Sequence, residues 1–455
     1  MTKPIPLSNP TALSTPYPSA ILSWYSTVLL ALLYWLSILD RSIISLMVDP
    51  IKADLGITDL QFGMLHGMAF AVTFSVFGIA AGALADRYSR RLVVFVSVTL
   101  WSLATAACGL AREFSHLLVA RVGVGAGEAG LNPAATSMIT DLFPPRRLTL
   151  ALAVYAMGAS VGAGSALIFG GMLVDWAEAL GQITVPVLGE IKSWQAIFLL
   201  IGLPGVVISL LAFSMPEPRR RGRLTTENQV PATRSIFSNY PVLFKFMRSQ
   251  RQFFTYHYLG FGLASAGFIG GTAWYPVHLS REFGWSGSQI GLGLGGAMII
   301  GGLLGKGIVG FLMDALYVRG YRDSQFLFYS IALLVATPIG IFMTLIDSPW
   351  GFVFSYGVFQ LLLGSLPAVY ISALNLVTPN EIRGTGIAFY AATIGLVAMS
   401  VGPLLIAAIS EYVFGGDAIG KGIAVNFLIC LPLAALILYR GRPSMRAAVI
   451  SANPS

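Results

Sequence analysis

Twelve apolar runs, each close to the length of a membrane-spanning helix, follow one another along this chain. About 20 apolar residues are needed to cross the hydrocarbon core of a bilayer, and an open sheet cannot cross it because its edges would leave backbone groups unpaired. Only 11% of the residues are charged, against about 25% in soluble domains. The sequence therefore predicts an all-α membrane protein with twelve transmembrane helices. Their approximate bounds are 21–48, 61–85, 92–110, 116–140, 148–174, 194–214, 253–279, 287–312, 325–346, 350–377, 384–410 and 418–439.

Basic residues gather in alternate loops between these runs. The largest group lies in the segment 216–251, and smaller groups follow the second, fourth, eighth, tenth and twelfth runs. Loops rich in Lys and Arg stay in the cytoplasm. The pattern predicts a multi-pass plasma-membrane protein, in the inner membrane of a bacterium, with both termini in the cytoplasm. Because this topology accounts for the net charge of +8, we expect no nucleic-acid partner.

The two halves of the chain repeat one another. Gly82-Ala-Leu-Ala-Asp86-Arg87 closes the second run, and Gly310-Phe-Leu-Met-Asp314 closes the eighth. Two pseudo-symmetric halves of this kind hold a substrate between them, near the middle of the bilayer. We expect a disordered cytoplasmic tail at 1–20, a six-helix bundle at 21–215, a basic cytoplasmic linker at 216–251, a second six-helix bundle at 252–440 and a cytoplasmic tail at 441–455.

Ionisable side chains interrupt the apolar runs of the first half at Asp40, Arg41, Arg121 and Glu128. A charge in hydrocarbon is costly, so such residues normally face a wet cavity or one another. Neighbouring helical residues point about 100° apart, so Asp40 and Arg41 cannot both face the same space. Arg121 lies seven residues before Glu128, on the same helix face. A purely structural ion-pair network is the alternative for these charges. Arg121 could also reach the membrane surface from the outer end of its span.

Three sequence motifs resemble those of a known family. Gly82-ALADRYS-Arg90-Arg91 resembles the signature loop of the major facilitator superfamily, G-x-L-a-D-R-x-G-R-R, and departs from it at Ser89. Leu117-LVA-Arg121-VGVGAG-Glu128 is similar to that family's fourth-span pattern. Asp40-Arg41, the Gly-Glu-Ala element at 127–129 and Trp194-QAIFLLIGLPG together resemble its spinster branch. This resemblance implies a proton-coupled secondary transporter that moves a lysolipid or sphingoid-like amphiphile by alternating access.

The resemblance also implies roles for individual residues. Asp40 and Glu128 would carry the proton, and Arg41 would meet an anionic headgroup. Polar and aromatic residues of the second half are expected to line the opposite wall, although Trp274 and Tyr275 also suit the interfacial belt at a span end. The expected substrate contacts are Arg41, Arg121, Tyr356, Tyr370 and Asn375. The expected gating residues are Gly82, Asp86, Arg87, Arg90, Arg91, Arg147 and Asp314.

Enzyme motifs are missing from the sequence. There is no phosphate-cradling Gly-rich loop with a lysine, no metal-ligand spacing among the four histidines and no nucleophile elbow. We therefore expect no enzymatic activity, no cofactor and no metal. The partners would be a lipid-like small molecule, protons and membrane lipids, and we expect a monomer. The alternatives are a broad-specificity drug or organic-anion transporter, an uncoupled lipid flippase and a non-transporting scaffold.

The direction of transport stays open at this stage. The antiporter pattern Gly-x-x-x-Gly-Pro of the fifth span is incomplete, because Gly158 and Gly162 are followed by Ala163 where proline would stand. Export by antiport therefore cannot be inferred from it.

Overall fold

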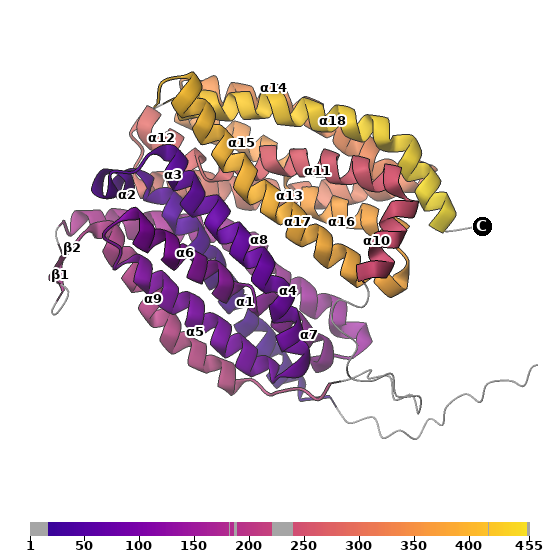
Figure 1. Cartoon of the computed structure of the whole chain (residues 1–455), viewed down its shortest axis with the longest axis horizontal. Coiled ribbons are helices and arrows are strands. Elements are labelled where there is room, and N and C mark those ends of the chain that lie inside the picture. Colours follow the sequence, from indigo (N-terminus) through magenta and orange to yellow (C-terminus); the bar gives the residue numbers. More distant parts are fainter. Residues whose placement is uncertain (1–16, 182, 186–188, 221–239, 417, 453–455) are drawn as a thin grey trace, which may run out of the picture.

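Two helical bundles lie side by side in the computed structural model, which describes residues 17–181, 183–185, 189–220, 240–416 and 418–452. The indigo-to-magenta helices of the first half occupy one side of Figure 1, and the pink-to-yellow helices of the second half occupy the other. The fold class predicted from the sequence is confirmed. The expected tail up to residue 16 and most of the expected linker, 221–239, lie outside the described residues.

The first half contains nine α-helices and a short antiparallel strand pair in its described residues. Thr184 pairs with Glu190 in that strand pair. The elements are α1 (Ala20–Ile43), η1 (Ile44–Leu46), α2 (Val48–Leu55), α3 (Asp59–Gly63), the π-helical η2 (Met64–Ala69), α4 (Phe70–Arg87), α5 (Arg90–Cys108), α6 (Phe114–Glu128), α7 (Leu131–Leu142), α8 (Pro145–Ala179), β1 (Ile183–Val185), β2 (Gly189–Ile191), α9 (Ser193–Ser209) and η3 (Leu210–Ser214).

The second half begins with a short helix inside the expected linker. The last helix stays helical to Ala452, so the expected tail at 441–455 starts within it. The elements are α10 (Tyr240–Ser249), α11 (Arg251–Thr272), α12 (Tyr275–Phe283), α13 (Gly287–Val318), α14 (Ser324–Leu345), α15 (Pro349–Leu363), α16 (Leu366–Val377), α17 (Asn380–Ala408), the π-helical η4 (Ile409–Val413) and α18 (Ile419–Ala452).

Judged by length and composition alone, ten helical segments of the described chain are long and apolar enough to cross a membrane. The other two expected spans, 116–140 and 253–279, are each divided into two helices. α6 gives way to α7 at Ala129 and Gly130, and α11 gives way to α12 near Pro276. A proline at the start of a helix cannot donate a backbone hydrogen bond to the preceding turn, so it favours such a boundary.

The break between α6 and α7 recurs in the second half, where α15 and α16 are separated by Gly364 and Ser365. In both halves a 15-residue helix is followed, after a two-residue gap, by a 12-residue helix. The internal repeat read from the loop motifs therefore extends to the interior of the spans.

The two halves meet closely at one end of the molecule. A Cβ added to Gly171 of α8 would overlap the carbonyl oxygen of Gly287 of α13, and one added to Gly291 would overlap that of Leu167. The backbones of α8 and α13 are thus in direct contact there, as small residues allow. A Cβ added to Gly67 of η2 would likewise overlap the carbonyl oxygen of Met399 of α17.

Toward the other end, several described glycines of α4 and α13 make no such contact. A Cβ added to Gly82 of α4, or to Gly302, Gly307 or Gly310 of α13, would meet no atom of another element within 4 Å. This is the end that carries Arg87 and Arg319, which the charge pattern predicts to be cytoplasmic. The halves are therefore closed at the end of α3 and α12 and separated at the basic end.

Candidate functional site: a cavity between the two halves

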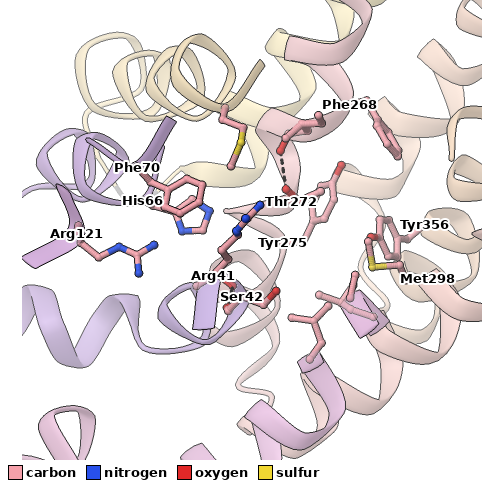
Figure 2. Close-up of a pocket in the computed structure, with 16 residues that line it drawn as sticks. Arg41, Ser42, His66, Phe70, Arg121, Phe268, Thr272, Tyr275, Met298 and Tyr356 are labelled. Atoms are coloured by element: carbon pink, nitrogen blue, oxygen red, sulfur yellow. Dashed lines mark hydrogen bonds between the residues drawn. The ribbon is translucent and has the colours of Figure 1, made fainter. Parts of the chain in front are cut away.

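A cavity of about 250 Å³ lies between the two halves and is lined by side chains from both. In the view of Figure 2, Arg121, His66 and Phe70 lie on one side, Tyr275 and Tyr356 lie on the other, and Arg41 is between them. The wall of the first half carries the positive charge, whereas the wall of the second half is aromatic and neutral. The main lining residues are Arg41, Ser42, Ser45, His66, Phe70 and Arg121 from the first half, and Phe268, Thr272, Tyr275, Leu294, Met298, Tyr356 and Met399 from the second.

Arg41 faces this cavity and is held by Glu128. Its Nε donates a hydrogen bond to Glu128 Oε2 at 2.5 Å, and the hydroxyl of Ser37 donates to the same oxygen at 2.6 Å. The side chain of Glu128 is fully buried, while that of Arg41 is 20% exposed. Arg41 lines the cavity and Glu128 does not, so the carboxylate lies behind the arginine with which it pairs.

Asp40 points away from the cavity, toward α5 and α6. It accepts a hydrogen bond from Thr105, and its Oδ1 lies 4.0 Å from Arg121 Nη1. Asp40 and Arg121 are each 1% exposed. The open question of which member of the adjacent pair faces the cavity is answered in this structure: Arg41 does. The burial of Arg121 also contradicts the alternative in which its guanidinium reaches the membrane surface.

Two ion pairs therefore join α1 to α6, one between Arg41 and Glu128 and one between Asp40 and Arg121. Phe70 lies against both guanidinium groups, with its ring centroid 4.6 Å from Cζ of Arg41 and 5.8 Å from Cζ of Arg121. An aromatic face attracts a cation, and the attraction is stronger away from water. Phe70 thus fixes both cations beside the cavity.

The opposite wall is built around two tyrosines. The rings of Tyr275 and Tyr356 lie 5.1 Å apart, and Gln360 Nε2 donates to the hydroxyl of Tyr356 at 2.5 Å. Trp274 and Tyr275 are 0% and 1% exposed, so the interfacial-belt alternative is wrong for both. Trp274 instead donates from Nε1 to the carbonyl oxygen of Pro403 at 3.0 Å. The proline at the start of α12 brings Tyr275 to the cavity immediately after the helix break.

Two of the expected substrate contacts lie elsewhere. Tyr370 packs within an aromatic cluster of the second half, 4.8 Å from the Tyr390 ring, and its carbonyl oxygen pairs with Nε2 of His257. Asn375 is exposed on α16. Neither is among the residues that line the cavity. His66 and Phe70 do line it, and only the polarity of His66 within an apolar run was visible in the sequence.

The expected gating loop is tied to its own half in this state. Arg90 is fully buried, pairs with Asp141, and donates from Nε to Glu217 at 3.0 Å. The backbone N–H of Arg91 donates to the same carboxylate at 3.0 Å. Burial alone would raise the pKa of Glu217, but hydrogen bonds from Arg91, Ser89 and Arg90 outweigh it and hold that pKa below its usual value.

The remaining gating candidates point to solvent or open space. Arg87, Arg147 and Asp314 are exposed, and Gly82 faces open space. The side chain of Asp86 lies outside the described part of the chain. These placements fit a loop that acts when the separated ends of the two halves come together.

An ionic clamp closes the opposite end. Arg281 of α12 donates to Asp49 of α2 at 2.6 Å and forms two hydrogen bonds of 2.9 Å with Asp59 of α3. Lys52 also contacts Asp59, at 2.6 Å. Burial alone would lower the pKa of Arg281, but its hydrogen bonds to Asp59 and Asp49 outweigh it and raise that pKa further above its usual value. The clamp was not anticipated from the sequence, because its members lie outside the expected spans and come from different halves of the chain.

Comparison with known proteins places these features in a family. The sequence profile described as Major Facilitator Superfamily matches residues 30–315. An "MFS-type efflux pump" of Mycolicibacterium smegmatis is 27% identical over 92% of both chains. A "Cis,cis-muconate transport protein" of Acinetobacter baylyi is 25% identical over 88% of this chain and 90% of its own. "Protein spinster homolog 1" of Xenopus tropicalis is 27% identical over 89% of this chain and 76% of its own.

A solved structure shows the same fold. It is described as a bacterial homologue of the human lysosomal transporter spinster, inward-facing and unoccupied. It covers 96% of this chain and 100% of its own, with a TM-score of 0.76 and 24% sequence identity. The resemblance read from the motifs is confirmed at the level of family and fold.

Proposed function

The chain belongs to the major facilitator superfamily and is a multi-pass secondary transporter that works by alternating access, and we propose that it moves a lysolipid or sphingoid-like amphiphile in exchange with, or together with, protons. The bacterial relatives suggest the inner membrane. The paired contacts at one end and the separated helices at the other fit one of the two states that alternating access requires.

The observation that carries the proposal is the Arg41–Glu128 pair at the cavity wall. An anionic group that enters the cavity competes with Glu128 for Arg41. A buried carboxylate that loses its counter-charge is costly, so it is neutralised by taking up a proton. Asp40 and Arg121 form a second acid–base pair immediately behind the first. Substrate binding and proton uptake are thereby linked through Arg41.

The lipid assignment rests on the apolar walls and the spinster relatives. Phe70, Phe268, Leu294, Met298 and Met399 all line the cavity, so an acyl or sphingoid chain finds apolar contacts beside the charged wall. The spinster homologue matches most of the chain.

A second candidate is a small organic anion. The cavity volume of about 250 Å³ suits a compact molecule better than a complete lysolipid. A muconate transport protein is among the relatives. An uncoupled flippase and a non-transporting scaffold are separated from both by the experiment below.

The test is transport of a labelled lysolipid in proteoliposomes, with and without a proton gradient. We expect gradient-driven transport by the wild type and loss of gradient dependence in Asp40→Asn, in Glu128→Gln or in both. Glu113→Gln, at an exposed acid 64% accessible, is the matched control and should behave as wild type.

Each of the other outcomes would favour a different function or substrate for this protein. Unchanged coupling in both variants removes the proton role of these acids. A hydrophilic dicarboxylate that outcompetes the lysolipid contradicts the lipid assignment. Wild-type transport indifferent to the gradient indicates a flippase, and no movement of any probe indicates a scaffold.

A further inference from the structure

Three arginines line an open pocket of about 320 Å³ at the basic end of the second half. Arg319 and Arg322 come from the loop that joins α13 to α14, and Arg446 comes from the end of α18. The other lining residues are Gly320, Tyr321, Asp323 and Ile450. None of these described residues also lines the cavity between the halves, so the pocket is a separate feature built by the second half alone.

A buried carboxylate holds the two sides of this pocket together. Arg442 Nε donates to Oδ2 of Asp323 at 2.6 Å, and Arg446 Nε lies 2.8 Å from Oδ1. The side chain of Asp323 is fully buried, whereas that of Arg446 is 48% exposed. The loop between α13 and α14 is thus fixed against α18, and Arg446 stays about half accessible beside it.

Arg319 and Arg322 have no such acidic partner. Asp323 follows Arg322 in the chain, but both of its oxygens are already held by α18. No ion pair joins either arginine to another described residue, and the guanidinium of Arg322 instead lies over the Tyr317 ring, with Cζ 4.6 Å from the centroid. With three arginines and one aspartate, the lining has a formal charge of +2. Because a guanidinium matches phosphate oxygens bidentately, the pocket suits a phosphate group.

The pocket lies where the helices leave the membrane. The loop 319–323 connects two apolar spans. At 1.5 Å a residue, the 34 residues of α18 extend roughly 50 Å, against about 30 Å for the hydrocarbon core, so its end projects past the core. Figure 1 shows that end on the side of the second half remote from α12. Exposed apolar side chains accompany the arginines: Val318 precedes Arg319 and is 86% exposed, and Ile450 lines the pocket and is 63% exposed.

We propose that this pocket binds an anionic phospholipid, with phosphatidylglycerol as the chemical type, from the leaflet at the basic end of the molecule. Arg319, Arg322 and Arg446 supply donors to the phosphate, and the exposed side chains of Val318 and Ile450 contact the acyl chains. Clusters of arginine at the end of a span attract anionic headgroups in this way. A free phosphate ion would leave the apolar side chains in water. The bound lipid is a partner of the second half and not the transported molecule, so this inference does not depend on the transport function above.

The test is protection of a cysteine placed in the pocket. Ile450→Cys, in the full-length protein, is labelled with the uncharged reagent N-ethylmaleimide in vesicles of phosphatidylcholine, with or without a quarter of the lipid replaced by phosphatidylglycerol. Cys108 and Cys430 are free and buried, and the protein without Ile450→Cys gives their background. We expect phosphatidylglycerol to slow labelling of position 450 severalfold.

Removal of the two unpaired arginines should abolish most of this protection. An arginine near the membrane surface contributes about a fivefold gain in affinity for anionic lipid, so Arg319→Gln/Arg322→Gln should weaken binding about 25-fold and either single variant about fivefold. Arg319→Lys/Arg322→Lys keeps the charges and should keep most of the protection. The matched control, Arg248→Gln/Arg251→Gln, removes two exposed charges outside the pocket lining and should be protected as fully as the protein with all its arginines.

Three results would overturn the proposal. Equal labelling rates with and without phosphatidylglycerol would show that the pocket takes no anionic lipid. Protection that persists in Arg319→Gln/Arg322→Gln, or that is lost equally in Arg248→Gln/Arg251→Gln, would show a general effect of surface charge. Equal protection by inorganic phosphate added to pure phosphatidylcholine vesicles would show that the pocket takes a soluble anion and not a lipid.

Discussion

Asp40 and Arg41 are neighbours in the chain but have different partners, because a helix turns successive side chains about 100° apart. Asp40 is directed at Arg121 in the interior of the first half, and Arg41 covers Glu128 at the cavity wall. The sequence predicts that the two side chains diverge but not which of them faces the cavity. A purely structural ion-pair network, the alternative interpretation, would make the same contacts. The strength of the Arg41–Glu128 pair is therefore tested by removing one of its partners.

Removing Arg41 alone leaves the buried carboxylate of Glu128 without its counter-charge. Breaking a buried pair in this way costs roughly 3 kcal/mol, at the low end here because Arg41 is partly exposed. We expect Arg41→Gln to lower the thermal unfolding midpoint in detergent and the double variant Arg41→Gln/Glu128→Gln to recover most of the loss. A double variant no more stable than Arg41→Gln would contradict a direct pair.

At the scale of elements, glycines decide where the helices of the two halves can touch. Gly171 of α8 and Gly287 of α13 bring two backbones into contact at the closed end. Gly296 lies farther along α13 and has open space beside it. The glycines of the sequence therefore fall into two kinds, those in close contact with another backbone and those beside open space. Only the packing of the helices distinguishes the two kinds.

A side chain at Gly171, where two backbones are in contact, should hold the two halves apart at the closed end. Ser45 lines the cavity, and in a Ser45→Cys background we expect Gly171→Leu to increase labelling of position 45 by a membrane-impermeant thiol reagent. The native Cys108 and Cys430 are free and buried, so their background should be low. Gly296→Ala is the matched control, and equal labelling in both variants would contradict a backbone seal at Gly171.

For the whole molecule, the clamp of Arg281 with Asp49 and Asp59 is a charged contact that keeps one end shut. Alternating access requires this contact to break when that end opens. The two halves then separate near α3 and α12 and approach each other near the gating loop at Arg90 and Arg91. Figure 1 shows α2, α3 and α12 together at the closed end.

Weakening the clamp should shift the balance between the two states. Arg281→Gln removes the cation while keeping a polar side chain, and we expect about a tenfold rise in the population open at that end, equivalent to about 1.4 kcal/mol. Distances between spin labels on α3 and α12 would report it. Lys52→Gln removes only the peripheral cation and should have a smaller effect. An unchanged distance distribution in Arg281→Gln would show that the close glycine contacts between the halves alone hold the closed end together.

The sequence by itself determined the membrane class, the repeated halves, the family and the charged residues of the first half. These follow from local properties: the length of an apolar run, the cost of charge in hydrocarbon and motifs contained in a single loop. Tertiary structure alone decided that Arg41 rather than Asp40 faces the cavity, that Tyr356 lines it while Tyr370 and Asn375 do not, and that His66 and Tyr275 line opposite sides of it. It also decided which end is closed, because that depends on contacts between residues such as Asp59 and Arg281, which are distant in the chain and adjacent only when the two halves pack.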